Sequence, residues 1–146
     1  GPAAKDPPPP KTSSPPPELP ENAGGVSRGR LYDKVNTLGF PGFEAAKDQV
    51  APYLREVRRR VEKRWNAMLL TRYSGTSPTD VVIDCAIAPD GTLARVDIVG
   101  EPKDRVYAAL CKEAVEKAGP FNPFPFKVPD MYRNRNLEIR WTFSFL

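Results

Sequence analysis

Proline placement divides this chain into two unlike parts. Half of its 18 prolines lie between Pro2 and Pro20, in the run PAAKDPPPPKTSSPPPELPEN. Proline fixes φ and lacks an amide donor, so we expect residues 1–22 to form neither a helix nor a sheet strand. We predict an extended polyproline II spacer, rising about 3.1 Å per residue. A disordered segment or a ligand for an SH3-type domain is the alternative.

The rest of the chain has the size of one globular domain. It belongs to a sequence of 146 residues that is 40% hydrophobic, which is enough to build a core. We place the domain at residues 46–146 and interpret 23–45 as a Gly-rich linker, some of whose apolar side chains dock on the domain. Gly1-Pro2 resembles the remnant of a removed purification tag. No apolar run is long enough to cross a bilayer, so we expect a membrane anchor only in a preceding, missing segment.

A long amphipathic helix is predicted at the start of the domain. Apolar residues recur there at three- and four-residue spacing, which places them on one stripe: Val50, Tyr53, Leu54, Val57, Val61, Trp65, Met68 and Leu69. Pro52 suits a first turn, so we expect the helix to begin near residues 49–51. The run Arg58-Arg59-Arg60 is interpreted as the solvated side of this helix, with a phosphate-binding patch as the alternative.

A β-hairpin follows the helix. Val81, Ile83, Cys85 and Ile87 alternate with the residues between them, as in a strand with one buried face. Pro89-Asp90-Gly91 predicts a tight turn, because proline presets φ at the first corner and glycine accepts the positive φ at the exit. The second strand should run from about residue 92 to residue 99.

A second helix and a final strand complete the pattern. Apolar residues between Val106 and Ala118 share one helical face, and Gly119-Pro120 predicts the helix end. A rigid aromatic loop, residues 121–125, comes next. The last strand alternates strictly, with these apolar members: Leu137, Ile139, Trp141, Phe143 and Phe145.

We therefore predict an α+β domain with the order helix, strand, strand, helix, strand. Two helices packed on one face of a three-stranded antiparallel sheet would bury every apolar stripe. A right-handed crossover through the second helix places the third strand beside the first, antiparallel to it, which gives the strand order 2-1-3. The second and third strands are then the edges of the sheet.

These ordered motifs resemble the TolA/TonB C-terminal domain family. The resemblance rests on VRRRVEKRW (57–65), IAPDGTLARVDIV (87–99), ALCKEAVEKAGPFNPFP (109–125) and the closing LEIRWTFSFL. It covers about residues 50–146 and leans to TolA, because of APDG and ALC, while the TonB branch stays open.

The resemblance implies a function in the cell envelope. Members have an inner-membrane anchor, a linker that spans the periplasm and a terminal domain that binds outer-membrane receptors or Tol-Pal partners. They pass on work from a separate proton-driven motor complex, which this chain would reach through its missing N-terminal part. The resemblance to TolA also implies a possible Cys85–Cys111 disulfide, which the periplasm would permit. Two buried thiols that never meet are the alternative.

The predicted partner site is the backbone edge of the last strand. An extended partner segment would add there by β-augmentation, or less favourably at the second strand. The residues of this predicted edge are Glu138, Ile139, Arg140, Trp141, Thr142, Phe143 and Ser144. Edge strands also permit domain-swapped dimers, with a monomer as the default.

Other functional classes are disfavoured by the sequence. It contains no histidine, the commonest general base and metal ligand, and no Gly-rich phosphate loop follows a strand. We therefore expect no catalytic residues, no metal and no cofactor. The net charge of +4 is spread over 22 basic and 18 acidic residues. A nucleic-acid-binding or other adaptor module is the alternative, but its aromatic residues would have to lie on an exposed sheet face.

Overall fold

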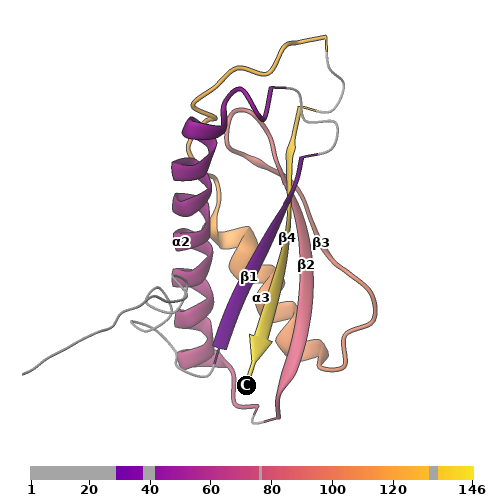
Figure 1. Ribbon diagram of the computed structural model, residues 1–146. Coiled ribbons are helices and arrows are strands. Elements are labelled where there is room, and N and C mark those ends of the chain that lie inside the picture. The colour runs from indigo at the N-terminus through magenta and orange to yellow at the C-terminus, as the bar shows by residue number, and fades with distance from the viewer. Residues whose placement is uncertain (1–28, 38–41, 76, 132–134) are drawn as a thin grey trace, which may run out of the picture.

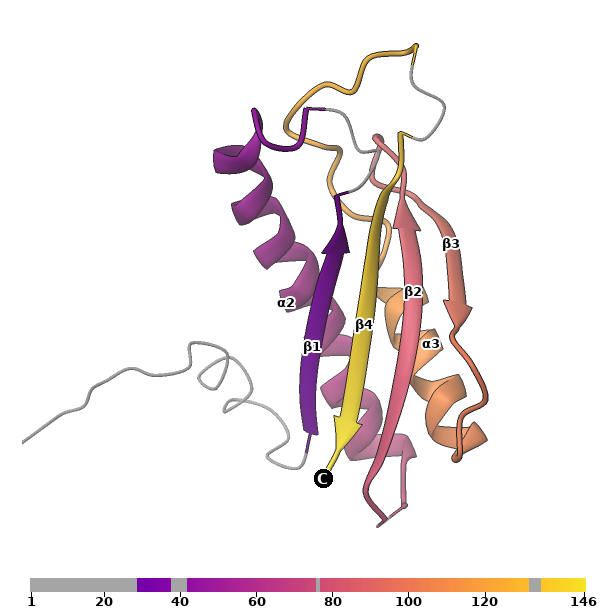
Figure 2. The same ribbon diagram turned by 45° about the vertical axis from the view of Figure 1, so that its right-hand side comes forward.

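The computed structural model describes residues 29–37, 42–75, 77–131 and 135–146; the predicted spacer at residues 1–22 lies outside them. Two helices cover one face of a four-stranded antiparallel sheet with the strand order β1-β4-β2-β3 (Figures 1 and 2). The elements are β1 (Gly29–Asn36), α2 (Lys47–Arg72), β2 (Thr79–Ile87), β3 (Leu93–Ile98), α3 (Arg105–Ala118) and β4 (Leu137–Phe145).

The prediction of a three-stranded sheet is wrong by one strand. The three predicted strands are present in the predicted arrangement, as β3-β2-β4. The fourth strand, β1, forms within the segment interpreted as a linker, and it pairs antiparallel with β4 along its whole length. Its apolar pattern is sparse, because only Leu31 is a fully buried large apolar side chain and Val35 is half-buried. A strand whose other side chains are mainly polar and exposed gives too weak an alternation to be recognised.

The connections interleave two β-α-β units. Strands β1 and β2 both run antiparallel to β4, which lies between them, so the two are parallel to each other and joined through α2. Likewise β3 and β4 are parallel, joined through α3 and separated by β2. Each unit thus leaves a gap that a strand of the other unit fills. The last strand of the chain therefore lies inside the sheet, as Figure 2 shows.

The predicted long helix is confirmed, and it begins slightly earlier than expected. It starts at Lys47, after a turn in which the Ala46 amide donates to the Gly42 carbonyl at 3.0 Å. Pro52 consequently lies in the second turn of α2. The predicted stripe faces the sheet. Its residue Trp65 is fully buried, with its ring edge-on to that of Phe143 at 5.2 Å between ring centroids. Large aromatic side chains in this contact contribute both apolar area and favourable ring geometry to the core.

The predicted hairpin turn is also confirmed, and it holds the aromatic loop. Gly91 has φ of +93°, and a Cβ there would collide with the carbonyl oxygen of Phe121. The Phe121 amide donates to the Gly91 carbonyl at 2.8 Å, and the Phe124 amide donates to the Pro89 carbonyl at 2.9 Å. Glycine is required at this position by both its backbone angle and the close approach.

Helix α3 begins at a side-chain cap. The Tyr107 amide donates to Asp104 Oδ1 at 2.9 Å, and the Tyr73 hydroxyl donates to Asp104 Oδ2 at 2.7 Å. The backbone bond from Tyr107, followed by the Tyr73 hydroxyl bond, lowers the pKa of Asp104 below its ordinary value. The same carboxylate therefore caps α3 and ties the end of the long helix to it.

We predict that Asp104→Ala lowers the free energy of unfolding by about 1–2 kcal/mol, as expected for loss of an N-cap. Asp104→Asn should retain most of that stability, because its amide oxygen can still accept from Tyr107. Since folding lowers the pKa of Asp104, its charge-dependent stabilisation is present above the ordinary pKa and is lost as pH falls through the folded value. Urea unfolding at neutral and acid pH measures both effects. Equal losses in the two variants at neutral pH would contradict the capping role.

Candidate functional site

Strand β4, the predicted partner site, lies at the centre of the sheet. Its odd-numbered residues face the helices, and Ile139, Trp141 and Phe143 are buried there. The Trp141 indole N–H donates to Cys85 Sγ at 3.3 Å. Its even-numbered residues Glu138, Arg140 and Thr142 face the side of the sheet that the helices leave open, where Ser144 is nevertheless buried. The predicted alternation of β4 is therefore confirmed, except that Ser144 is buried.

The prediction that β4 is an edge strand is wrong. It pairs with β2 from Leu137 to Phe145 on one side and with β1 from Glu138 to Phe145 on the other. Both of its backbone edges are therefore used within the chain. Partner binding at this strand stays a prediction, and it now requires that β1 leave.

Strand β1 is fastened to α2 as well as to β4. Arg58 donates through Nη1 to Asp33 Oδ1 at 2.6 Å and through Nη2 to the Leu31 carbonyl. Its side chain is only 13% exposed and also lies 3.6 Å from Glu62. The interpretation of Arg58 as a solvated residue was therefore wrong. Only its neighbour Arg59, 62% exposed and paired with Glu56, matches that prediction.

The start of β1 lies directly against the core. A Cβ added at Gly29 would come within 2.6 Å of the Trp65 ring carbon Cη2. Only a residue without a side chain fits this position unless the buried ring moves. The sequence signal that could have found β1 is the inward series of Gly29, Leu31, Asp33 and Val35, whose acidic member masks the alternation.

The other edge of the sheet is β3, and it is poorly suited to pairing. The strand has six residues, and its register with β2 shifts between Ala86 and Ile87. Arg95 and Asp97 form an ion pair at 2.8 Å along it. Short length, irregular pairing and charged side chains are features that protect sheet edges from adding further strands.

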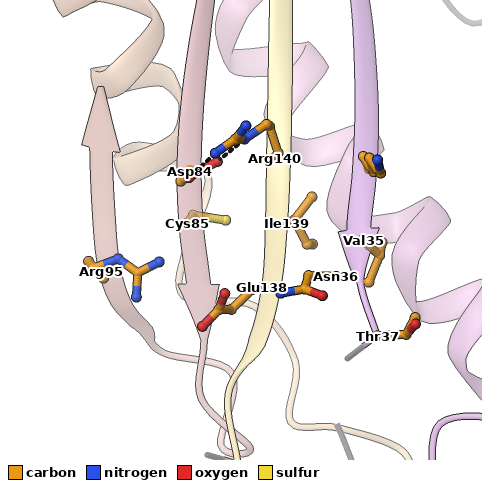
Figure 3. A pocket seen from close by; sticks show the side chains of 10 residues that line it. Val35, Asn36, Thr37, Asp84, Cys85, Arg95, Glu138, Ile139 and Arg140 are labelled. Carbon is orange, nitrogen blue, oxygen red and sulfur yellow. Dashed lines mark hydrogen bonds and ion pairs between the residues drawn. The ribbon is translucent and has the colours of Figure 1, made fainter. Parts of the chain in front are cut away.

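The open face of the sheet carries a shallow hollow of about 440 Å³ that crosses all four strands (Figure 3). Charged side chains from each strand line it: Lys34, Asp84, Arg95, Glu138 and Arg140. Arg140 donates to both Asp84 carboxylate oxygens, at 2.8 and 2.9 Å, and these bonds lower the pKa of Asp84. Arg140, a residue of the predicted partner edge, thus already has an acidic partner inside the domain.

A second hollow, of about 570 Å³, lies between the start of α2 and the aromatic loop. Its walls include Pro52, Tyr53, Phe121 and Pro123. The Tyr53 hydroxyl donates to the Asn122 carbonyl at 2.7 Å, and burial raises the Tyr53 pKa to about 12. This hydroxyl therefore stays protonated and fixes the loop over a wide pH range.

The two cysteines are separate, buried thiols, and the structure does not contain the disulfide that the resemblance implied. Cys85 accepts from Trp141, and burial raises its pKa to about 11. Burial also raises the pKa of Cys111, on α3 beside Tyr107 and Trp65. Both sulfurs act as small core side chains with little thiolate at neutral pH.

Neither a metal centre nor a membrane span is found in the described parts of the chain. Their His, Cys, Asp and Glu residues form no group of three that could hold an ion. Among the helices described, α2 is the longer, but its charged faces leave no segment apolar enough to cross a bilayer.

The comparison with protein families matches residues 50–140 to the family described as TonB C terminal. The match covers more than half of the chain and runs from the start of α2 into β4, so it leaves β1 outside. No curated protein and no solved structure matches the chain.

We predict that neither thiol of the native protein reacts with a water-soluble disulfide reagent at pH 8 on a timescale of minutes, because both are buried with raised pKa values. In the unfolded, unreduced protein, two thiols per chain should then react with the reagent. A titration that finds none in the unfolded protein would establish a Cys85–Cys111 bond instead.

Proposed function

Because this chain belongs to the TonB C-terminal family, we propose that it is the protein-binding domain of an energy-transducing protein of the cell envelope. It would lie in the periplasm, tethered to an inner-membrane anchor by its proline-rich segment. There it would couple a proton-driven motor complex to an outer-membrane receptor or a Tol-Pal component. The observation that carries this proposal is the family match, which extends over both helices and into the central strand.

The mechanism we propose for partner capture is β-augmentation. A partner segment in extended conformation would extend the sheet, with main-chain hydrogen bonds supplying affinity and side-chain positions supplying selectivity. An open antiparallel sheet, with β1 and β3 as its terminal strands, supports this mechanism. The proposal is one of binding rather than catalysis, in keeping with a sequence that has no histidine.

The choice between the two branches depends on the partner. APDG at residues 88–91 and ALC at residues 109–111 favour a TolA-like protein. In that case the partner is a peptidoglycan-associated lipoprotein or another translocation component. An outer-membrane receptor would place the protein in the TonB branch.

A site-specific photocrosslinking experiment tests this proposal. A photoreactive residue is placed at Thr142, on the open face of β4, or at Arg95, on β3. The matched control is Val106, 68% exposed on α3 at the opposite side of the sheet. We expect an identified outer-membrane receptor or Tol-Pal component to be captured from envelope extracts at a sheet position and not at the control. Capture of no envelope protein at either sheet position would overturn the proposed function.

A further inference from the structure

Strand β1 occupies the sheet edge that a partner strand would need, although it lies outside the segment that matches the family. Residues 50–140 contain most of α2, the hairpin strands β2 and β3, all of α3 and the start of β4. Without β1, one whole edge of β4 would be free to pair. This edge would be longer and more regular than β3, since its register with β1 runs unbroken from Gly29 opposite Phe145 to Asn36 opposite Glu138.

The attachment of β1 is weaker than that of the two central strands, β2 and β4. As the terminal strand of the sheet, it pairs with β4 alone. It places one large side chain, Leu31, fully in the core, whereas β4 places five there. Burial of apolar area is the main source of stability for a strand in a sheet, so β1 should open at a lower free energy than β2 or β4.

Each inward-facing residue of β1 contacts a defined part of α2 or of the core. Gly29 lies so close to the Trp65 ring that a Cβ would collide with it, and Leu31 belongs to the core cluster. Asp33 pairs with Arg58, and Val35 packs against the edge of the same cluster. The groups that β1 contacts belong to α2 and to the core, so they would remain in place after β1 left.

We infer that β1 is a placeholder strand and that the edge of β4 beneath it is the docking site for the partner. This inference rests on the proposed function. The partner strand replaces β1, antiparallel to β4, and presents the same inward series: a small residue, an aliphatic residue, an acidic residue and an aliphatic residue at alternate positions. Arg58 favours an acidic residue at the position of Asp33, and Trp65 excludes a large side chain at the position of Gly29.

Such an exchange has a clear physical logic. One set of ladder hydrogen bonds replaces another, so the net cost is small. The backbone edge of β4 is covered by β1 or by the partner strand in both states, so its donors and acceptors stay paired. Because β1 is part of the same chain, it competes at high effective concentration, and the apparent affinity for a partner falls by the fraction of time that the edge is free. Weakening β1 must then strengthen binding.

The first test is a reversible lock. Arg30 and Ser144 are opposite each other in the ladder, and Ser144→Cys is nearly isosteric. Opposite residues in an antiparallel pair have Cα separations of about 4.5–5.5 Å, within the range of a disulfide. Oxidation of the Arg30→Cys/Ser144→Cys protein fixes β1 at both ends, since the chain already continues into α2. We expect capture of the envelope partner to be lost in the oxidised form and restored in the same protein after reduction.

The second test uses a synthetic peptide of residues 29–36, GRLYDKVN, as the probe in trans. Against the full chain, Leu31→Ala should strengthen peptide binding about tenfold or more, because it loosens the competing strand. The control Arg30→Ala, at an exposed position of β1 outside the hollow, should leave binding unchanged. A peptide with asparagine at the position of Asp33 should bind about fivefold more weakly, and amide shifts of the bound complex should map to β4 and Arg58.

The outcomes separate this inference from the proposed function. Equal capture of an identified envelope partner by the oxidised and reduced lock would overturn the placeholder inference and leave the proposed function standing. Peptide shifts confined to Leu93–Ile98 would overturn it in the same way. If the peptide competes with β1 as expected but no envelope protein is captured by any form, the exchange stands and the proposed function fails.

Discussion

The double pairing of β4 is the constraint on which this domain depends. The strand comes last in the chain but lies between β1 and β2, so neither β-α-β unit has a complete sheet until it is inserted. Its five inward side chains also supply the floor on which α2 and α3 pack, with Trp141 and Phe143 fully buried. Backbone pairing and core packing therefore meet in one strand. A disturbance of β4 would affect both layers of the domain.

The two edges of the sheet are protected in different ways. At β3 the protection is intrinsic, through a short strand, a register shift and the Arg95–Asp97 pair. On the other side of the sheet, β4 is covered by β1, a strand from a segment outside the family match. The features that protect β3 belong to the strand itself and are permanent. The covering of β4 by β1 can be removed by a competing strand with the same sequence pattern as β1. The Arg58 contacts to Asp33 and Leu31 set how firmly β1 is held.

The sequence predicted the elements with strong periodicity and missed the one without it. Both helices, the Pro89-Asp90-Gly91 turn and the order of three strands followed from apolar spacing, turn chemistry and crossover geometry. Strand β1 could not be predicted in this way, because its place in the sheet comes from pairing with a strand about 100 residues later. Arg58 was misjudged for the same reason. A basic residue on a helix looks solvated until the carboxylate and carbonyl that it binds are brought to it by the fold.

The position of β1 at the start of the described chain would give the exchange a mechanical consequence if the preceding residues form the proposed tether. The chain enters the sheet at Gly29, so tension on the preceding segment reaches β1 before any other described element. While β1 is docked, that tension acts on the Arg58 contacts and on the ladder with β4. Once a partner strand has taken its place, the eight residues of β1 are released from the sheet. Tension at Gly29 would favour this exchanged state, because pulling there separates β1 from β4. A domain that binds its partner more firmly when its tether is pulled suits a protein that transmits work across a gap.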